Sequence, residues 1–171
     1  MSSTLTAVTM KGNPVTLLGT DVHVGASAPD CTLVANDLSE FKLSSLKGKR
    51  VILSVVPSLD TGICDLQTKR FNQEAGKLGN DVVILTISMD LPFAQKRWCG
   101  ATGCDKLKTL SDHRDANFGQ AYGLLIKGLR LLARAILIVD SNGTLRYKQI
   151  VPEITTEPKY DDALAALKNI K

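Results

Sequence analysis

The 171-residue sequence has no apolar run long enough to cross a bilayer. A membrane-spanning helix needs about 20 consecutive apolar residues, and the runs here are much shorter. The first residues, MSSTLTAVTMKGN, also lack the basic start and long apolar region of a secretory signal. We therefore expect a cytoplasmic protein without a membrane partner, whose thiols are kept reduced.

Metal-site patterns are scarce as well. The sequence has two histidines and no Cys-x-x-Cys pair, which are the usual components of zinc sites. We expect neither a metal nor another bound cofactor. In a cytoplasmic chain the four cysteines, Cys31, Cys64, Cys99 and Cys104, indicate catalytic or redox use at least as readily as structural disulfides.

Positive charge is not concentrated in any one segment. The formal net charge is +4, and the basic residues stand in short scattered groups such as Lys47, Lys49 and Arg50. A nucleic-acid site usually needs a clustered basic stripe and a more basic domain. We therefore expect no nucleic-acid partner.

The sequence shows no internal repeat, low-complexity segment or linker, and its length suits one domain, here residues 1–171. Alternating patterns predict an α/β fold with a mixed central sheet flanked by helices. An N-terminal β-hairpin is expected at about residues 4–18, with its turn at 11–13. The main strands are predicted at 31–36, 51–56, 81–88, 107–112, 134–140 and 144–151, and the helices at 65–78, 93–101, 117–123 and 160–170.

The chemistry-bearing feature is a cysteine after the first strongly apolar strand. Residues 51–56 predict a buried strand, and Cys64 follows it near the start of a helix. Unpaired amide groups and the helix dipole favour negative charge at that position, where a cysteine tends to be a nucleophilic thiolate. The alternative to a reactive thiolate is that Cys64 serves only as a small buried apolar side chain on the inner face of the helix.

Thr61 stands three residues before Cys64, where dithiol oxidoreductases carry their second cysteine. A hydroxyl cannot resolve a mixed disulfide, but it can donate to a thiolate and accept from a small polar reactant. The substitution argues for attack on something other than a protein disulfide. A sulfenic acid formed here would need a more distant thiol to resolve it.

The segment PSLDTGIC, with Pro57, Thr61 and Cys64 in a Pro-x-x-x-Thr-x-x-Cys arrangement, resembles the active-site loop of peroxiredoxins. Three further segments are similar to hallmark stretches of the bacterial thiol peroxidase subfamily: DLPFAQKRWCG, LLARAILIVD and EITTEPKYDDAL. The resemblance extends from about Lys11 to Leu167. It implies a thioredoxin-like fold.

The resemblance also implies a reaction. Cys64 would reduce hydrogen peroxide and alkyl hydroperoxides to water and alcohols, and would become a sulfenic acid. Cys99 would resolve that acid as an intramolecular disulfide, which thioredoxin would reduce. Pro57 would shield the thiolate, Thr61 would be its hydroxyl partner and Arg134 its guanidinium partner. The family further implies an antioxidant role and a homodimer.

Arg134 opens the apolar stretch RAILIVD, so we expect its charged head at the end of a core strand. In a parallel pair of core strands, such an end can lie beside Cys64. The cation would then stabilise the thiolate and the leaving oxygen. The alternative is a solvated charge at a strand end. Trp98 and Phe93 are interpreted as packing residues around the helix that carries Cys99.

Several alternatives stay open. Cys104 forms a Cys-x-x-x-x-Cys pattern with Cys99 and could be an incidental thiol, an alternative resolving thiol or part of a metal pair. Cys31 and Cys104 stand where the family pattern does not lead us to expect cysteines. The same site would also serve a redox sensor that is oxidised once, whereas Thr61 disfavours a protein disulfide reductase. A disulfide needs Cα atoms within about 7 Å. Two cysteines on separate helices commonly lie farther apart, so we expect the pairing of Cys64 and Cys99 to unwind one or both helices locally.

Overall fold

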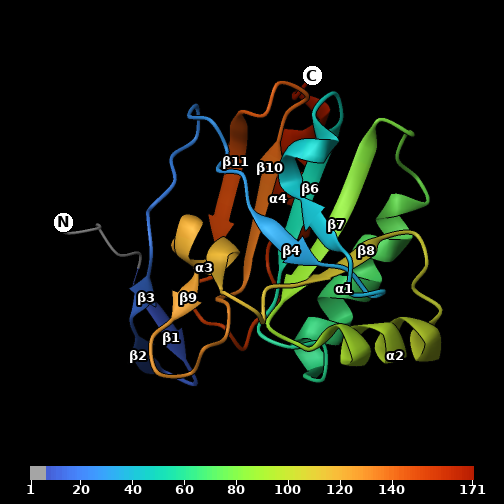
Figure 1. Ribbon diagram of the computed structural model, residues 1–171. Coiled ribbons are helices and arrows are strands. Elements are labelled where there is room, and N and C mark those ends of the chain that lie inside the picture. The colour runs from blue at the N-terminus through green and yellow to red at the C-terminus, as the bar shows by residue number, and fades with distance from the viewer. Residues whose placement is uncertain (1–6) are drawn as a thin grey trace.

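A seven-stranded mixed sheet forms the centre of the computed structural model, which describes residues 7–171 (Figure 1). Its strands are β4 Thr32–Val34, β5 Glu40–Lys42, β6 Arg50–Val55, β7 Val82–Ser88, β8 Lys108–Ser111, β10 Ala135–Val139 and β11 Leu145–Ile150. They lie in the order β11-β10-β6-β7-β8-β4-β5. The three strands β6, β7 and β8 are parallel to one another, and the other pairings are antiparallel. The predicted mixed sheet is confirmed.

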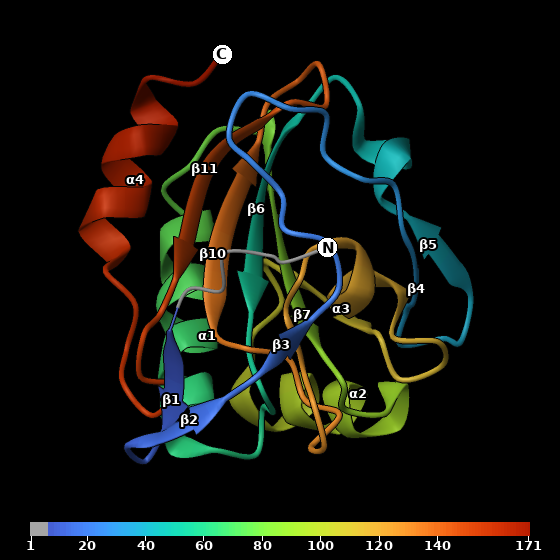
Figure 2. The same ribbon diagram turned by 90° about the vertical axis from the view of Figure 1, so that its left-hand side faces the viewer.

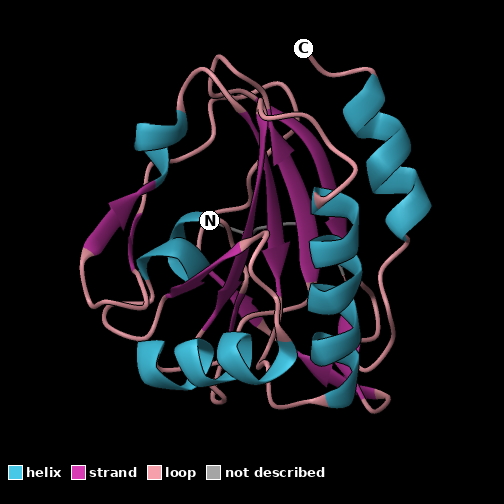
Figure 3. Cartoon of the chain, turned by 90° about the vertical axis from the view of Figure 1, so that its right-hand side faces the viewer, coloured by secondary structure: helices cyan, strands magenta, loops and turns pink. Residues whose placement is uncertain are grey.

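Helices cover both faces and one end of this sheet. They are η1 Leu43–Leu46, α1 Gly62–Ala75, α2 Pro92–Thr102, α3 Asn117–Ala121 and α4 Tyr160–Lys168. Figure 2 and Figure 3 show α1 and α4 on one face, α3 on the opposite face and α2 across one end. The predicted strands and helices are present with ends displaced by about three residues at most. The interpretation of residues 1–171 as one domain stays a prediction.

Each face of the sheet has its own apolar core. Between the sheet and the pair α1 and α4, Ile52 and Ile136 pack with Phe71 and Ala163. The larger core on the opposite face includes Leu53 and packs against α3. Strands buried on both faces explain why β6 and β10 read as nearly continuous apolar runs.

The direction of β10 corrects one expectation from the sequence. We expected a parallel core pair to bring Arg134 beside Cys64, and that arrangement is wrong. β10 is antiparallel to β6, and Ala135 pairs with Val55. The start of β10 therefore lies beside the end of β6, which is where the chain turns toward α1. In a parallel pair of the same strands, these two ends would lie at opposite edges of the sheet.

The expected N-terminal hairpin is present as β1 Val8–Met10 and β2 Asn13–Val15, and residues 4–6 of its expected range lie outside the described residues. Thr9 joins it to the C-terminal loop, because its N–H donates to Pro152 O at 2.7 Å and its carbonyl accepts from Ile154 N at 2.9 Å. Next along the chain, β3 (Leu17–Leu18) pairs with β9 (Leu125–Ile126). Within residues 7–171, no helix is both long and apolar enough for a membrane span.

Candidate active site

The loop between β6 and α1 is held by a carboxylate that follows the neighbouring strand β7. Pro57 is buried two residues after the end of β6. The Asp90 carboxylate accepts hydrogen bonds from Ser58 Oγ at 2.7 Å, Leu59 N at 2.8 Å and Ser88 Oγ at 2.7 Å. Asp90 was not predicted as a site residue. Its position after a strand parallel to β6 is the signal that could have found it, because the carboxyl ends of parallel strands meet at one edge.

Cys64 is the third residue of α1, and its side chain is fully buried. It lies in a small apolar cluster with Val56, Leu59, Trp98 and Cys104. Amide groups in the first turn of a helix have no helical acceptors and carry partial positive charge. The cysteine therefore lies where a negative charge is favoured but where bulk water is excluded.

Arg134 lies beside this sulfur and is itself only 2% exposed. Its Nη2 donates to Cys64 Sγ at 3.2 Å, its Nη1 to Gln67 Oε1 at 2.9 Å and its Nε to Ile154 O at 2.8 Å. Gln67 is fixed in turn, because its Nε2 donates to Ser54 Oγ at 2.8 Å. The alternative of a solvated strand-end charge is wrong. Gln67 was missed, although a residue three positions after Cys64 shares its helix face.

The partners of Arg134 have an electrostatic consequence. A buried cation is costly unless hydrogen bonds and an opposite charge compensate it. The carbonyl of Ile154 and the amide of Gln67 are neutral acceptors. The Cys64 sulfur is the one partner of this guanidinium, within residues 7–171, that can become an anion.

Thr61 occupies the position before α1, but its hydroxyl makes no hydrogen bond to the sulfur of Cys64. Its Oγ1 donates to Ser58 O at 3.1 Å, and its backbone carbonyl accepts from Asp65 N at 3.0 Å. The side chain is exposed. In this conformation the threonine stabilises the loop and the helix start, and its role as a partner of the thiolate stays a prediction.

Cys99 lies on α2 and packs, half-buried, against the cluster that contains Cys64. Its Sγ is 3.6 Å from Thr109 Oγ1. Burial raises the pKa of the Cys99 thiol, the Thr109 hydroxyl lowers it, and the charge of Cys104 raises it further. All four cysteines are free thiols. The two predicted redox cysteines are thus placed around one cluster without a bond between them.

A single hydrogen bond ties the two helices that carry these thiols. Trp98 Nε1 donates to Asp65 Oδ1 at 2.9 Å, which joins α2 to the first turn of α1. Trp98 is 8% exposed, as expected of a packing residue. The same expectation for Phe93 is wrong, because this side chain is 66% exposed. Phe93 lies near the start of α2, where its side chain is not covered by the sheet.

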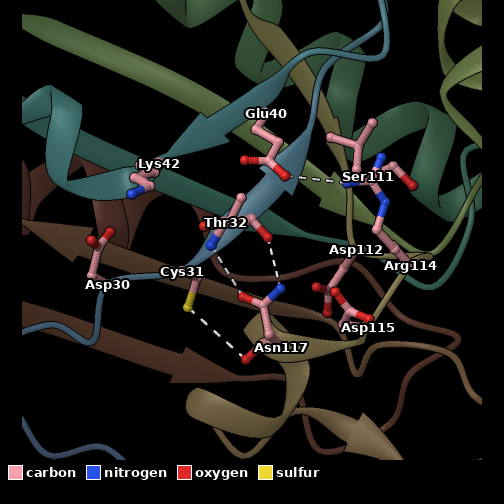
Figure 4. A pocket seen from close by; sticks show the side chains of 11 residues that line it. Asp30, Cys31, Thr32, Glu40, Lys42, Ser111, Asp112, Arg114, Asp115 and Asn117 are labelled. Carbon is pink, nitrogen blue, oxygen red and sulfur yellow. Dashed lines mark hydrogen bonds and ion pairs between the residues drawn. The ribbon is translucent and has the colours of Figure 1, made fainter.

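The remaining cysteine, Cys31, lines a polar cavity of about 530 Å³ between β4, β5 and α3 (Figure 4). Asp30 and Asp112 line the same cavity. Burial, followed by the charges of Asp112 and Asp30, raises the pKa of Cys31 to about 12, so this thiol is inert at neutral pH. None of the predicted site residues lines this cavity within the described chain. Among residues 7–171, no three histidine, cysteine or acidic side chains are grouped so that they could hold a metal ion.

Known proteins are similar in sequence to this chain over nearly its whole length. The family model "Redoxin" matches residues 23–164. The chain is 56% identical over 161 residues to "Thiol peroxidase" of Bacillus subtilis, covering 94% of this chain and 96% of that relative. It is 51% identical over 166 residues to "Thiol peroxidase" of Staphylococcus aureus (strain MRSA252), covering 97% of this chain and all of that relative.

Solved structures show the same fold. A peroxiredoxin-like protein from Aquifex aeolicus superposes with a TM-score of 0.90 at 40% identity, covering 96% of this chain and 97% of that one. The thiol peroxidase from Chromobacterium violaceum has a TM-score of 0.84 at 19% identity, with 95% of each chain covered, and supports the fold alone. The predicted thioredoxin-like fold is confirmed.

Proposed function

The chain belongs to the redoxin family, in which it is a peroxiredoxin-type thiol peroxidase, and we propose that Cys64 is the thiol with which it reduces peroxides. One observation carries this proposal. Cys64 Sγ is fully buried and accepts a hydrogen bond at 3.2 Å from the buried guanidinium of Arg134. A fixed cation beside a sulfur at a helix start favours the nucleophilic thiolate.

In the first step, the Cys64 thiolate attacks one peroxide oxygen and the O–O bond breaks. The sulfur is oxidised to a sulfenic acid, and the other oxygen takes up a proton and leaves as water or as an alcohol. Arg134 donates to the sulfur in the resting state, and the same cation can stabilise the charge that develops on the leaving oxygen. Pro57, which is buried in the loop that Asp90 binds, is proposed to shield the thiolate from water.

Hydrogen peroxide and alkyl hydroperoxides are the proposed substrates. The cluster around Cys64 is formed by apolar side chains, including Val56, Leu59 and Trp98. An apolar surround accommodates an alkyl group more readily than a charged one, because burial of apolar area is favourable and burial of an unpaired charge is costly. This surround supports the inclusion of alkyl hydroperoxides.

In the second step, the Cys99 thiolate attacks the sulfenic sulfur of Cys64. Hydroxide leaves and takes up a proton to become water, and an intramolecular disulfide joins the two cysteines. Because Cys64 lies inside α1 and Cys99 inside α2, the step is expected to unwind part of one or both helices.

Thioredoxin is the proposed reductant of this disulfide, acting in the cytoplasm, and the enzyme serves antioxidant defence without a cofactor. Neither nucleic acid nor a membrane is a proposed partner. The protein is proposed to be a homodimer, as the family resemblance implies. Light scattering coupled to size-exclusion chromatography should then give about twice the chain mass of 18.4 kDa.

A coupled peroxide-reduction assay with thioredoxin, its reductase and NADPH tests the proposal. We expect sustained consumption by the wild type and no activity for Cys64→Ser. Cys99→Ser should lose thioredoxin-supported turnover and accumulate a sulfenic acid at Cys64. The matched control is Cys31→Ser, which alters another buried thiol and should keep full activity.

Sustained activity in Cys64→Ser would overturn the assignment. Consumption of about one equivalent of peroxide by the wild type, followed by a stop in the complete coupled system, would instead identify a redox sensor.

A further inference from the structure

Two cysteines at the end of α2 share one solvent-open groove. Cys99 and Cys104 both line this groove of about 540 Å³, together with Asn36, Phe41 and Thr109. Cys64 does not line the groove, although it belongs to the same apolar cluster as Cys104. Cys104 thus belongs both to the cluster that contains Cys64 and to the lining of the groove, and the proposed peroxide reduction makes no use of it.

The cap of α2 turns the chain back so that Cys104 faces the last turn of the helix. Gly103 has a left-handed conformation with φ of 68°, and its N–H donates to Cys99 O at 3.0 Å. A left-handed cap of this kind commonly packs the following residue against the last helical turn. Cys104 is that residue, and it is only 4% exposed.

Electrostatics agrees with this closeness. Burial is the largest cause of the raised pKa of Cys99, and the charge of Cys104 adds to it. Such an effect falls off with distance, and the two thiols line the same groove. Only four residues separate them in the sequence.

We propose that Cys104 is a second resolving thiol. Once the Cys64–Cys99 disulfide has formed, Cys104 replaces Cys64 as the disulfide partner of Cys99. The proposal rests on the proposed function, because it needs the Cys64–Cys99 disulfide as its starting point. It assigns a redox role to Cys104, whose role the sequence analysis left open.

The exchange is balanced within the chain. The Cys104 thiolate attacks the Cys99 sulfur, the bond between Cys64 and Cys99 breaks, and Cys64 leaves as a thiolate. The proton lost by Cys104 goes to solvent. One disulfide is exchanged for another, so no external oxidant or reductant is consumed.

Two features favour this direction of exchange. A thiol that leaves readily as an anion speeds disulfide exchange, and Arg134 donates to the Cys64 sulfur in the reduced structure. Departure of Cys64 also lets α1 return to its packed conformation, in which this side chain is fully buried. The new disulfide would then lie in the groove, where thioredoxin can reach it.

The exchange changes how much peroxide one chain consumes before it needs a reductant. The first equivalent produces the Cys99–Cys104 disulfide and restores the Cys64 thiol. The second equivalent then oxidises Cys64 to a sulfenic acid that has no partner left. The wild type should consume about two equivalents per chain, whereas a chain without Cys104 should consume about one.

The test is a titration of fully reduced protein with hydrogen peroxide in the absence of thioredoxin, in the presence of dimedone to trap sulfenic acid, followed by peptide mapping. For the wild type we expect the Cys99–Cys104 disulfide and dimedone on Cys64. For Cys104→Ala we expect the Cys64–Cys99 disulfide and little dimedone. Cys31→Ser should behave like the wild type. The wild-type map is informative even if Cys104→Ala folds poorly.

A wild-type chain that stops at about one equivalent, with only the Cys64–Cys99 disulfide, overturns the exchange and leaves the proposed function intact. The two proposals fail together only if well-folded Cys104→Ala forms neither a sulfenic acid on Cys64 nor a disulfide that includes it.

Discussion

At the scale of single residues, the proposed peroxide reduction depends on one contact between a buried cation and a sulfur. Arg134 is held by the neutral oxygens of Ile154 and Gln67, so its orientation does not depend on the state of Cys64. Its third donor group then faces the sulfur at 3.2 Å. A preorganised donor of this kind costs no rearrangement when charge moves during the reaction.

Replacement of this cation should slow the peroxide step. Arg134→Gln removes the charge, and we expect the rate of Cys64 oxidation to fall by about 100-fold to 1000-fold, as for the loss of a comparable donor. Stopped-flow fluorescence of Trp98, which packs in the same cluster as Cys64, measures this rate. The control is Arg114→Gln, which removes an exposed arginine paired with Glu40. Equal rates for both variants would contradict the role of Arg134.

The raised pKa of Cys99 predicts a pH dependence of the resolving step. A thiol with a raised pKa is less ionised at neutral pH, and its reactive thiolate fraction grows about tenfold per pH unit below that pKa. The rate of disulfide formation should therefore rise steadily between about pH 6 and 8.5. The slow phase of the same fluorescence experiment reports it. A rate that is level over this range would show that ionisation of Cys99 is not limiting.

At the scale of elements, the two helices that carry the thiols must loosen for a disulfide to form. Gly100 follows Cys99 inside α2, and its backbone is open, with nothing within 4 Å of the place a Cβ would take. Glycine destabilises a helix interior by roughly 0.5–1 kcal/mol relative to alanine. Gly100 thus lowers the free-energy cost of unwinding α2 next to Cys99.

Stiffening of α2 should slow resolution and leave peroxide reduction unchanged. For Gly100→Ala we expect the rate of the slow phase to decrease about two- to fivefold. This factor is the difference of roughly 0.5–1 kcal/mol between glycine and alanine in a helix, converted to a ratio of rates. The matched control is Ala101→Gly, at the next exposed helical position, which should have the opposite effect. Both variants are measured by stopped flow with hydrogen peroxide. A change in the fast phase rather than the slow one would contradict this account of α2.

The elements, the N-terminal hairpin and the motif could be predicted from the sequence, but the direction of β10 and the contacts of Asp90 and Gln67 could not. Apolar runs identify β6 and β10 as buried strands, and Pro57, Thr61 and Cys64 stand together in one short segment. The antiparallel direction of β10 leaves no trace in an apolar run, because a strand buried on both faces reads the same in either direction. Asp90 and Gln67 were missed because their partners Ser58 and Arg134 are distant in sequence, so that a strand end or a helix face indicates the region but not the contact.

At the scale of the whole molecule, a sheet buried on both faces supports two helices that carry the redox thiols. The strands β6, β7 and β10 form the interior of the sheet and are covered on both faces. The layer that contains Cys64 and Cys99 is joined across its helices by the Trp98–Asp65 hydrogen bond. Oxidation should therefore loosen this layer and leave the sheet intact.

Hydrogen exchange monitored by mass spectrometry can test this division. In oxidised Cys104→Ala, which keeps the Cys64–Cys99 disulfide, we expect faster exchange in the first turns of α1 and in α2, because a disulfide between them cannot form with both helices intact. Peptides from β6 and β10 should exchange as slowly as in the reduced protein. Oxidised Cys99→Ser, which cannot form this disulfide, should show no loosening. Uniform loosening of the whole chain would contradict a change confined to one layer.

The most direct test of the central claim is chemical trapping in Cys99→Ser. This variant is treated with one equivalent of hydrogen peroxide in the presence of dimedone, and the modified residue is located by peptide mass spectrometry. The account predicts nearly complete labelling of Cys64, and labelling that falls sharply when Arg134 is also changed to Gln. Labelling of Cys31 or Cys104 instead, with Cys64 unmodified, would contradict it.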